Sequence, residues 1–496
     1  MSTPHTQSAP LSPSPQGRTG RAVVVGSGPN GLTAAALLAR RGWDVEVFER
    51  NAMIGGAAAS SDLLGPGTTV DLGAAGHPFG VVSPAFRELE LTEHGLEWLH
   101  PELPMAHPLE GRPAAVLHRS LEQTARELDG DGHAWTALHR PIVEHLDRHV
   151  ENILGPLLRV PPHLTDMVRF GLRAPWPASA LGRVLFRDEP ARALFAGSAV
   201  HAVVPPGSLL TSAFGTVFGA IGMTHGWPVA AGGTGSIPAA LASIITSHGG
   251  RIHLGQEITD LAQLPPADAV LLDLTPRQVL ALEGVDLAPG FARRMRNWRY
   301  GTGSSKVDYL LDGPIPWTDP RVAGAGTVHV AGTVAELQHA EAEARAGRLP
   351  DRPFVMVCQQ QAADPTRARG PVAGSTVVWT YAHVPAGCDT PVDGLIEAQI
   401  ERFAPGFRDR ILRRVASTPS ILEAWNPNLI GGDVAGGSMG GLQQVLRPGL
   451  TFSPHRTGTP GLYLCSSSTP PGGGVHGMAG YWAARAAVQD LHDDGR

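Results

Sequence analysis

Short apolar runs alternate with helix-forming segments near the start of the chain. Residues 21–25 (RAVVV) form an apolar run that predicts a buried strand, and LTAAALLARRG, ending at Gly42, predicts a helix. The next run, residues 44–50 (DVEVFER), alternates and is rich in β-branched side chains, which predicts a second strand. Together these segments predict a right-handed βαβ unit with parallel strands.

Similar segments return later in the chain. SIPAALASIITSHGG predicts a helix, and RIHLGQEITDL and residues 267–274 (ADAVLLDL) predict further strands of the same sheet. The tail, residues 461–489, predicts a strand, a Gly-rich loop and a helix. Residues 91–223 are instead rich in helical patterns and Pro, and residues 300–385 hold several strand-like runs. The sequence therefore predicts a parallel-sheet domain interrupted by an inserted domain.

Composition narrows the class of protein. A chain of 496 residues is expected to form at least two packed units, and 42% hydrophobic with 17% charged residues suits a buried, loop-rich enzyme. The net charge of -6 provides no basic face for a phosphate backbone, which argues against nucleic-acid binding. Three distant cysteines without metal-ligand spacing indicate a reducing cytoplasm and no metal site. Residues 1–20 lack an apolar core and predict a disordered tail.

One long segment carries no charge. Between Arg192 and Arg251 there is no Asp, Glu, Lys or Arg, but Gly and Pro interrupt the apolar run, so no span of about 20 apolar residues suits a bilayer crossing. We expect a buried core segment. The alternatives are an apolar wall of a substrate tunnel and a surface that dips into a membrane.

A glycine fingerprint follows the first strand directly. Gly26, Gly28 and Gly31 form GxGxxG, in which glycines permit the tight turn, the approach of a pyrophosphate and the packing of helix on strand. The pyrophosphate would lie at the helix N-terminus, where free N–H groups favour an anion. Glu49, at the end of the next strand, is placed to accept hydrogen bonds from ribose hydroxyls. This context predicts dinucleotide binding.

FAD and NAD share this fingerprint, so other motifs must separate them. Gly55 and Gly56 lie just beyond the acid, and Gly472 to Gly474 precede the last predicted helix. A glycine loop before a helix lets backbone N–H groups approach a ligand, and the positive helix end favours an anionic reduced flavin. No second GxGxxG follows a strand with a trailing acid, and there is no CxxxxC, which argues against an NAD(P)H-driven disulfide reductase.

The N-terminal segment VVVGSGPNGLTAAALLARRGWDVEVFERNAMIGGAA and the C-terminal segment LYLCSSSTPPGGGVHGMAGYWAA resemble the phytoene desaturase and carotenoid/retinoid oxidoreductase family of the amine-oxidase-like FAD superfamily. The resemblance covers essentially the whole chain after residue 20. NLIGGDVAGG and PGGGV resemble the branch holding the pyridine nucleotide-disulfide oxidoreductase domain-containing protein 2 and desaturase-like carotene ketolases. The chain departs from this pattern at two places: the double glycine of GGAAASS is not followed by the Arg that is often present there, and Ser466 stands where Gly is frequent.

The resemblance implies FAD as cofactor and an α/β fold: a Rossmann-like FAD-binding domain with a parallel sheet and an inserted α+β substrate domain. The FAD-binding domain is expected to comprise residues 21–90, 230–285 and 450–496, and the substrate domain residues 91–229 and 286–449. It also implies contacts of the ADP half, the adenine and the isoalloxazine with these residues: Gly26, Gly28, Asn30, Gly31, Glu49, Arg50, Gly55, Gly56, Ala57, Ile258, Gly474, Val475 and Met478.

Two residues are candidates for catalysis. His476 lies inside the predicted flavin loop, and Lys306 is the only lysine of the chain, in a predicted strand (GSSKVDYLL) that by resemblance faces the flavin. A lysine in an otherwise Arg-only sequence suggests a site that needs a compact charge or an amine whose pKa shifts on burial. His77, His201 and His225 lie in Gly/Pro-rich or uncharged surroundings that fit cavity walls, but each is more often a structural histidine.

The function implied is oxidation of an apolar or unsaturated substrate by hydride transfer to flavin, with oxygen or a quinone as electron acceptor. A carotene-ketolase-like or amine-oxidase-like reaction, and a flavin-bound interaction protein without turnover, remain alternatives. Cytoplasmic location, peripheral membrane contact and a homodimer complete the expectations. The residues alone do not identify the substrate, because the inserted domain carries no readable motif.

Overall fold

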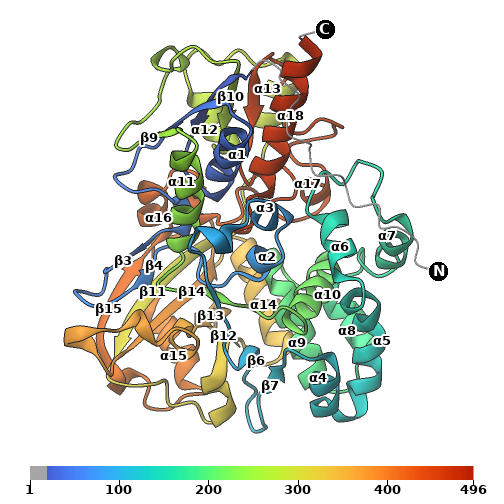
Figure 1. Ribbon diagram of the computed structural model, residues 1–496. Coiled ribbons are helices and arrows are strands. Elements are labelled where there is room, and N and C mark those ends of the chain that lie inside the picture. The colour runs from blue at the N-terminus through green and yellow to red at the C-terminus, as the bar shows by residue number, and fades with distance from the viewer. Residues whose placement is uncertain (1–18, 495–496) are drawn as a thin grey trace.

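The computed structural model describes residues 19–494, and the disordered tail predicted for residues 1–20 lies almost wholly outside that range. Two large sheets organise the chain. The first, with its helices, occupies the upper part of Figure 1, and the second lies below it. The chain passes between them several times, so segments distant in sequence meet where the two parts join.

The first sheet has five strands in the order β16-β10-β1-β2-β9, and all its pairs are parallel. Its strands are β1 (Arg21–Val25), β2 (Asp44–Phe48), β9 (Arg251–His253), β10 (Ala269–Leu272) and β16 (Leu462–Leu464). The predicted βαβ unit is confirmed, with Val23 opposite Glu46 in the register. These short, buried strands have the continuous apolar character of a sheet that is covered on its faces.

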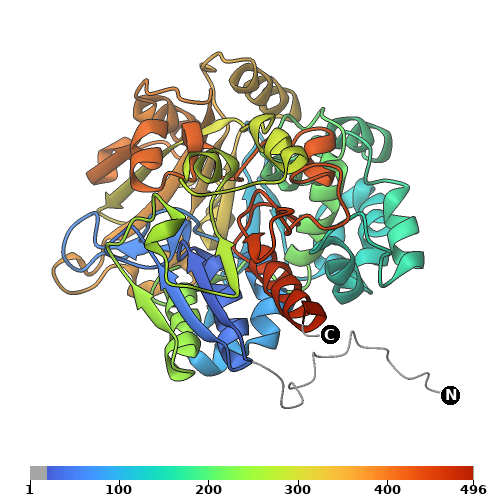
Figure 2. The same cartoon turned by 90° about the horizontal axis from the view of Figure 1, so that it is seen from above.

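Three helices pack beside this sheet: α1 (Pro29–Arg40), α11 (Ser236–Ser247) and α18 (Met478–Asp494). Figure 2 shows α1 and the C-terminal α18 side by side. Gly480 permits this close crossing, because a Cβ added there would lie 1.8 Å from the carbonyl oxygen of Asn30. The C-terminal helix therefore docks directly on the helix that begins at the glycine fingerprint.

The second sheet has seven strands in the order β15-β11-β14-β13-β12-β6-β7. All pairs are antiparallel except β12 with β6. Its strands are β6 (Leu103–His107), β7 (Ala115–Leu117), β11 (Gly303–Leu311), β12 (Ala325–Val330), β13 (Val355–Cys358), β14 (Thr376–Val384) and β15 (Ile411–Ser417). Two small pairs join β3 (Ser60–Ser61) to β4 (Val70–Asp71) and β5 (Trp98–Leu99) to β8 (Val229–Ala230).

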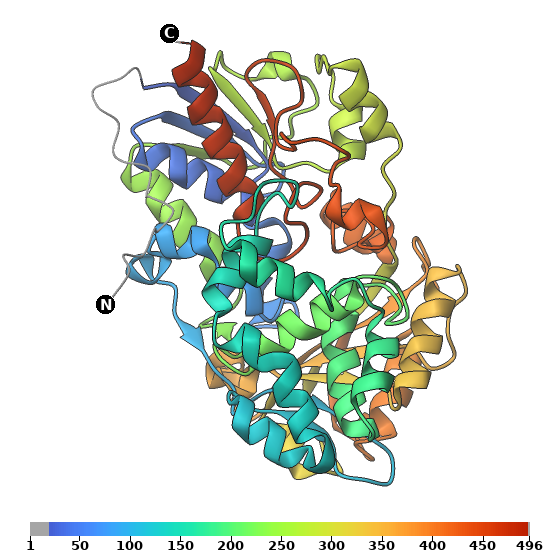
Figure 3. The ribbon, with the colours of Figure 1, turned by 90° about the vertical axis from the view of Figure 1, so that its right-hand side faces the viewer.

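Figure 3 shows a group of helices from the middle of the chain lying together below α18. Within this group, α9 packs on β6 and β7 and against α10. The remaining α-helices are α2 (Pro78–Val81), α3 (Pro84–Glu88), α4 (Leu121–Glu127), α5 (Gly132–Val143), α6 (Leu146–Ile153), α7 (Leu164–Gly171), α8 (Ala178–Leu185), α9 (Glu189–Ala199), α10 (Thr211–Gly222), α12 (Pro276–Ala281), α13 (Pro289–Arg296), α14 (Val334–Arg345), α15 (Asp393–Glu401), α16 (Pro419–Trp425) and α17 (Leu442–Val445).

The charge-free segment is mostly core, as expected. The side chains of α9 from Ala193 to Ala199 and most of α10 are buried, as is the inner face of α11. Burial explains the lack of charge, because an unpaired ion in this interior would lose its hydration. Within residues 19–494, no helix combines the length and hydropathy needed to span a membrane.

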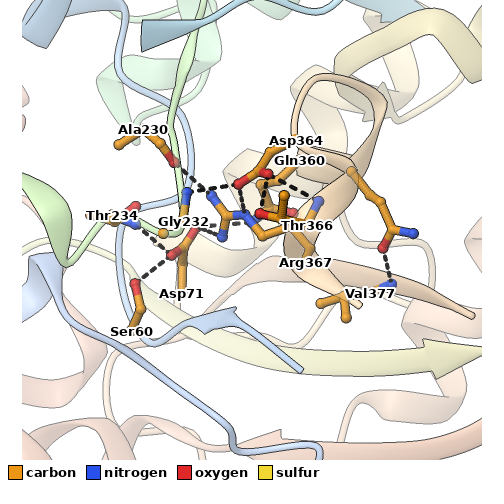
Figure 4. Close-up of polar contacts among 12 residues, drawn as sticks. Ser60, Asp71, Ala230, Gly232, Thr234, Gln360, Asp364, Thr366, Arg367 and Val377 are labelled. Carbon is orange, nitrogen blue, oxygen red and sulfur yellow. Dashed lines mark hydrogen bonds and ion pairs between the residues drawn. The ribbon is translucent and has the colours of Figure 1, made fainter. Parts of the chain in front are cut away.

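A buried ionic network ties the two parts of the molecule together (Figure 4). The Arg367 guanidinium donates to Asp71 Oδ2 at 2.8 Å, to Asp364 Oδ2 at 3.0 Å and to the Ala230 carbonyl oxygen at 3.2 Å. The Arg367, Asp71 and Asp364 side chains are each at most 1% exposed. Asp71 Oδ1 also accepts from the Thr234 N–H at 2.8 Å. One guanidinium thus joins β4, the end of β8 and the loop after β13.

Candidate functional site

One large cavity of about 450 Å³ runs from the carboxyl ends of β1, β2 and β10 to the face of the second sheet. Ligands of parallel α/β sheets bind at this end of the strands. The first half of the cavity is lined by the glycine loop and by residues that follow β2 and β10. The second half is lined largely by apolar and aromatic residues of the second sheet and the mid-chain helices. The site therefore has a polar half and a largely apolar half.

The glycine fingerprint forms a tight turn between β1 and α1. Gly26 has a φ of +97°, which side-chain-bearing residues rarely adopt. A Cβ on Gly31 would lie 2.2 Å from the Gly26 carbonyl oxygen, and one on Gly28 would lie 2.6 Å from Asp273 Oδ2. In the first turn of α1, whose N-cap is Gly28, Pro29 carries no N–H and the Gly31 N–H donates to Asp273, which leaves the Asn30 N–H at the end of the sheet. These glycines leave the backbone open to an anionic group.

Glu49 lies at the end of β2 and is buried. Its Oε2 accepts from the Ser27 N–H at 2.9 Å and the Ser27 hydroxyl at 2.7 Å, and its Oε1 accepts from the Asn51 N–H at 2.8 Å. These bonds fix the carboxylate beside the glycine loop. Glu49 also lines the cavity, so its oxygens are available to hydroxyl groups of a bound ligand.

Asp273 is a site residue that the sequence analysis did not single out. It follows β10 directly, lines the cavity, and accepts the Gly31 N–H at 3.0 Å through Oδ2. Burial raises the pKa of its carboxyl to about 7, and the Glu49 charge acts in the same direction, while the Gly31 N–H opposes the shift. In the sequence, Asp273 could have been recognised as an acidic residue directly after an apolar strand. The sequence did not reveal that β10 neighbours β1 in the sheet.

Side chains from the second sheet and the mid-chain helices line the other half of the cavity. Lys306 and Ser304 come from β11, and Trp379 and Tyr381 come from β14. The full set on this side comprises His201, Val203, Phe214, Phe218, Trp227, Ser304, Lys306, Thr327, Met356, Cys358, Trp379 and Tyr381. None of these residues is acidic, so this half suits an uncharged, largely apolar molecule.

Lys306 and Asp308 form a buried ion pair on one face of β11. The Lys306 ammonium also lies 5.6 Å from the centre of the Trp379 ring. Burial lowers the pKa of Lys306, while the Asp308 charge and hydrogen bond oppose that shift. Burial raises the pKa of Asp308 to about 6, against the effect of Lys306. The pair presents one cation at the cavity wall with its counter-ion behind it.

Most of the predicted site residues lie together on the cavity wall. The lining includes Gly26, Gly28, Asn30, Glu49, Arg50, Gly56, Ala57, Ile258, Lys306, Gly474 and Val475. His77 and His201 line it as well, although the sequence marked them only as candidates for a cavity wall.

Four predicted residues lie outside the lining: Gly31, Gly55, His476 and Met478. The structure does not bring His476 to the cavity: the ring is buried, and Nδ1 accepts the Met478 N–H at 3.0 Å at the start of α18. Met478 is buried in the core beside α1. The physical reason is the glycine turn: Gly474 and Val475 face the cavity, and the turn directs the His476 ring into the protein.

The polar half fits the ADP portion of FAD. It combines a glycine cradle that any Cβ would obstruct, a helix N-terminus for the pyrophosphate and a fixed carboxylate for the ribose. Ile258 and Gln256 line the cavity beyond Glu49, where an adenine would extend. The Gly473 to Val475 loop lies at the junction with the apolar half, where the redox-active ring would meet a substrate.

The family model described as flavin containing amine oxidoreductase matches residues 30–286. The rat pyridine nucleotide-disulfide oxidoreductase domain-containing protein 2 (Rattus norvegicus) is 28% identical, covering 95% of this chain and 93% of the rat protein. The phytoene desaturase (neurosporene-forming) of Rhodobacter capsulatus is 26% identical, covering 93% of this chain and 92% of its own. Both similarities therefore extend over nearly the whole chain.

Solved structures share the fold. An oxidoreductase from Methanosarcina mazei superposes with a TM-score of 0.64 at 18% identity, covering 95% of this chain and all of its own. Cyclohexylamine oxidase from Brevibacterium oxydans gives a TM-score of 0.58 at 14% identity, over 97% and 100% of the two chains. The predicted fold class and the predicted cofactor are confirmed. The chain belongs to the flavin-containing amine oxidoreductase family and is an FAD-dependent oxidoreductase.

Proposed function

We propose that the protein is a desaturase-type dehydrogenase. It would remove one hydrogen from each of two adjacent carbons of an apolar or unsaturated substrate and form a double bond between them. The observation that carries the proposal is the lining of the second half of the cavity, which is largely aromatic and aliphatic with no Asp or Glu among its described residues. An amine substrate would be favoured by a carboxylate near its nitrogen. The phytoene desaturase relative supports the same class of substrate.

FAD, when bound, supplies the hydride acceptor, and the chain supplies position and environment. The glycine loop and Glu49 would hold the ADP half, which fixes the register of the cofactor along the cavity. Phe218, Trp227 and Tyr381 would orient an apolar substrate and exclude water from the reacting carbons. The Lys306 ammonium would stabilise the negative charge that reduction brings into the site. Formation of the double bond also releases one proton from the neighbouring carbon, and this proton must pass to solvent or to the reduced flavin.

The function is tested by anaerobic addition of unsaturated hydrocarbons to the FAD-loaded protein. Small molecules that co-purify with the protein, identified by mass spectrometry, provide the first substrates to try. We expect bleaching of the oxidised flavin spectrum by an apolar substrate and formation of a product with one more double bond. Bleaching by a primary amine, with release of an aldehyde, would instead establish the amine-oxidase alternative.

We predict that Lys306→Met keeps bound FAD but slows anaerobic flavin reduction or its re-oxidation at least about tenfold, equivalent to about 1.4 kcal/mol of barrier. The reason is loss of the one cation that the second sheet presents to the cavity among the described residues. Stopped-flow absorbance measures both half-reactions. Lys306→Met alone leaves the buried Asp308 carboxylate without its cation. The Lys306→Met/Asp308→Asn double variant removes that charge as well and should be equally slow, because the slowing comes from the loss of the Lys306 cation. Wild-type rates in both half-reactions would contradict a catalytic role for Lys306.

The raised pKa of Asp273 leads us to expect that the affinity for FAD depends on pH. Below pH 7 its carboxyl is neutral, and above pH 7 it becomes a carboxylate beside the loop that would hold the pyrophosphate. Repulsion between the two anions should raise the dissociation constant of FAD by up to about tenfold per pH unit above neutrality. Titration of the apoprotein with FAD across this range provides the measurement. Asp273→Asn should bind FAD with a flat profile, and a wild-type profile without slope would refute the coupling.

We also propose a peripheral contact with an anionic membrane surface. Leu164, Val168 and Leu172 repeat along and just beyond α7 and are 59%, 58% and 73% exposed. Arg169 and Arg173 are exposed on the same segment, a combination that suits lipid headgroups and the apolar layer beneath them. Flotation with vesicles containing anionic lipid tests the contact. Binding should fall in Val168→Asp, and equal flotation of both proteins would exclude it.

A further inference from the structure

One wall of the apolar half is built by helices and loops before β8. Its lining residues are His201, Val203, Phe214, Phe218 and Trp227. The Trp227 Nε1–H is already used, since it donates to the Phe218 carbonyl oxygen at 3.2 Å. His201 is therefore the residue of this wall whose side chain still offers a polar atom to the cavity.

The His201 ring is held rigidly. It lies in a 3-10 turn (Val200–Ala202) directly after α9. It stacks on the Phe218 ring at 4.7 Å between centroids, with 11° between planes. The Trp227 ring meets it edge-on at 5.0 Å and 84°. These contacts fix the plane of the imidazole and hence the direction of its two nitrogens.

One of these nitrogens forms a hydrogen bond with a second histidine. His201 Nε2 lies 3.1 Å from His329 Nε2, and His329 is fully buried on β12. Burial lowers the pKa of His201 to about 3 and that of His329 well below its usual range, so both rings are neutral. A hydrogen bond between two neutral rings needs an N–H on one Nε2 and a lone pair on the other. The question is which ring donates.

The surroundings of His329 decide which of the two rings donates the hydrogen bond. His329 Nδ1 is buried without a hydrogen-bond partner in the described residues. It faces Gly197, where a Cβ would lie 2.6 Å from it. A buried N–H without an acceptor is rarer and more costly than an unpaired lone pair. His329 therefore carries its proton on Nε2 and donates to His201.

His201 must then carry its own proton on Nδ1. This atom has no protein partner within residues 19–494, and the ring lines the cavity. The buried histidine thus fixes the tautomer of the cavity histidine, as an outer partner does in many active sites. The result is one rigid N–H donor on an otherwise apolar wall.

We propose that His201 binds substrate by donating its Nδ1–H to an uncharged oxygen of an otherwise apolar molecule, and that His329 positions it. The substrate class is an unsaturated molecule that carries a carbonyl or hydroxyl oxygen. This inference rests on the proposed function and adds a polar group to its substrate. A carboxylate is disfavoured, because the wall around His201 offers it no cation.

The test uses the FAD-loaded protein and two matched probes: geranylacetone, an unsaturated ketone, and the hydrocarbon in which a methylene replaces its carbonyl. Binding is followed by the perturbation of the flavin absorbance spectrum. We expect the ketone to bind about tenfold more tightly than the hydrocarbon, which is the effect of one hydrogen bond.

Variants separate the donor from the packing. His201→Phe keeps a ring of similar shape, so the hydrocarbon should bind as before while the preference for the ketone disappears. His329→Leu should also reduce the preference, because His201 is then free to move its proton to Nε2. His329→Gln should retain it, because the Gln side-chain N–H replaces the lost donor. Equal binding of both probes by the wild type, or an unchanged preference in His201→Phe, would overturn the proposal.

A second measurement does not require flavin. Nitrogen NMR of the ¹⁵N-histidine-labelled apoprotein, with the His201 signals identified from the His201→Phe variant, reports the tautomer directly. We expect a protonated Nδ1 on His201. A protonated Nε2 would overturn the inference even if the protein proves to be a desaturase. Failure of FAD to bind would refute the proposed function while leaving this tautomer result to stand.

Discussion

Gly31→Val should abolish FAD binding, so that the purified variant lacks the visible absorbance of oxidised flavin. A Cβ at this position would lie 2.2 Å from the Gly26 carbonyl oxygen and 3.1 Å from Asp273 Cβ. Neither neighbour is a flexible side-chain end, so α1 must move away from β1, and the N–H groups that would meet the pyrophosphate move with it. The measurement is the absorbance spectrum after reconstitution with excess FAD.

Two companion variants separate this effect from misfolding. Gly394→Val, at the start of α15, places the same side chain where no atom lies within 4 Å, and it should bind FAD normally. Glu49→Ala adds no clash but removes a charged acceptor, which should weaken FAD binding by about 1.5–3 kcal/mol, or roughly 10- to 150-fold. A Gly31→Val protein with wild-type colour would contradict the location of the cofactor.

Arg367→Met should lower the free energy of unfolding by about 3–5 kcal/mol, because it leaves two carboxylates buried without their shared cation. Asp71 and Asp364 are each at most 1% exposed, so water cannot replace the guanidinium. Denaturation followed by circular dichroism gives the measurement.

The controls for this prediction use the same side-chain change and the same network. Arg140→Met removes an exposed pair with Glu122 and should change stability by no more than about 1 kcal/mol. Combining Arg367→Met with Asp71→Asn and Asp364→Asn should restore part of the lost stability, since the buried charges are gone. If Arg367→Met unfolds like the wild type, the network does not join the two parts of the molecule.

The parallel sheet could be predicted from local patterns. Val23 to Val25, the glycine turn and the alternating run to Phe48 are contiguous, so one short window contains the strand, the turn and the acid that follow one another. Four strands of the second sheet, β11 to β14, were also visible as apolar runs, whereas β15 was not predicted and β6 and β7 lie in a segment for which helices were predicted. Their order was not visible, because pairing such as that of β12 with β6 joins residues far apart in sequence.

The candidate site shows the same difference between local motifs, which could be predicted, and contacts between distant segments, which could not. Gly28 and Glu49 belong to a local motif, so their place at the end of the parallel sheet could be predicted, while their contacts with FAD stay a prediction. Asp273 and the pairing of His201 with His329 depend on which distant segments meet, which no spacing in the sequence records. His476 shows the opposite case: its place in the glycine loop suggested the active site, but the turn directs its ring into the protein.

The structure of the protein with FAD bound tests the central claim most directly. We expect the ribose hydroxyls against Glu49, the pyrophosphate at the Gly28 end of α1, and the isoalloxazine between the Gly473 to Val475 loop and Lys306. The face of the ring toward His201 and Phe218 should be open to substrate. An adenine bound away from Glu49, or an isoalloxazine outside the apolar half of the cavity, would contradict the account.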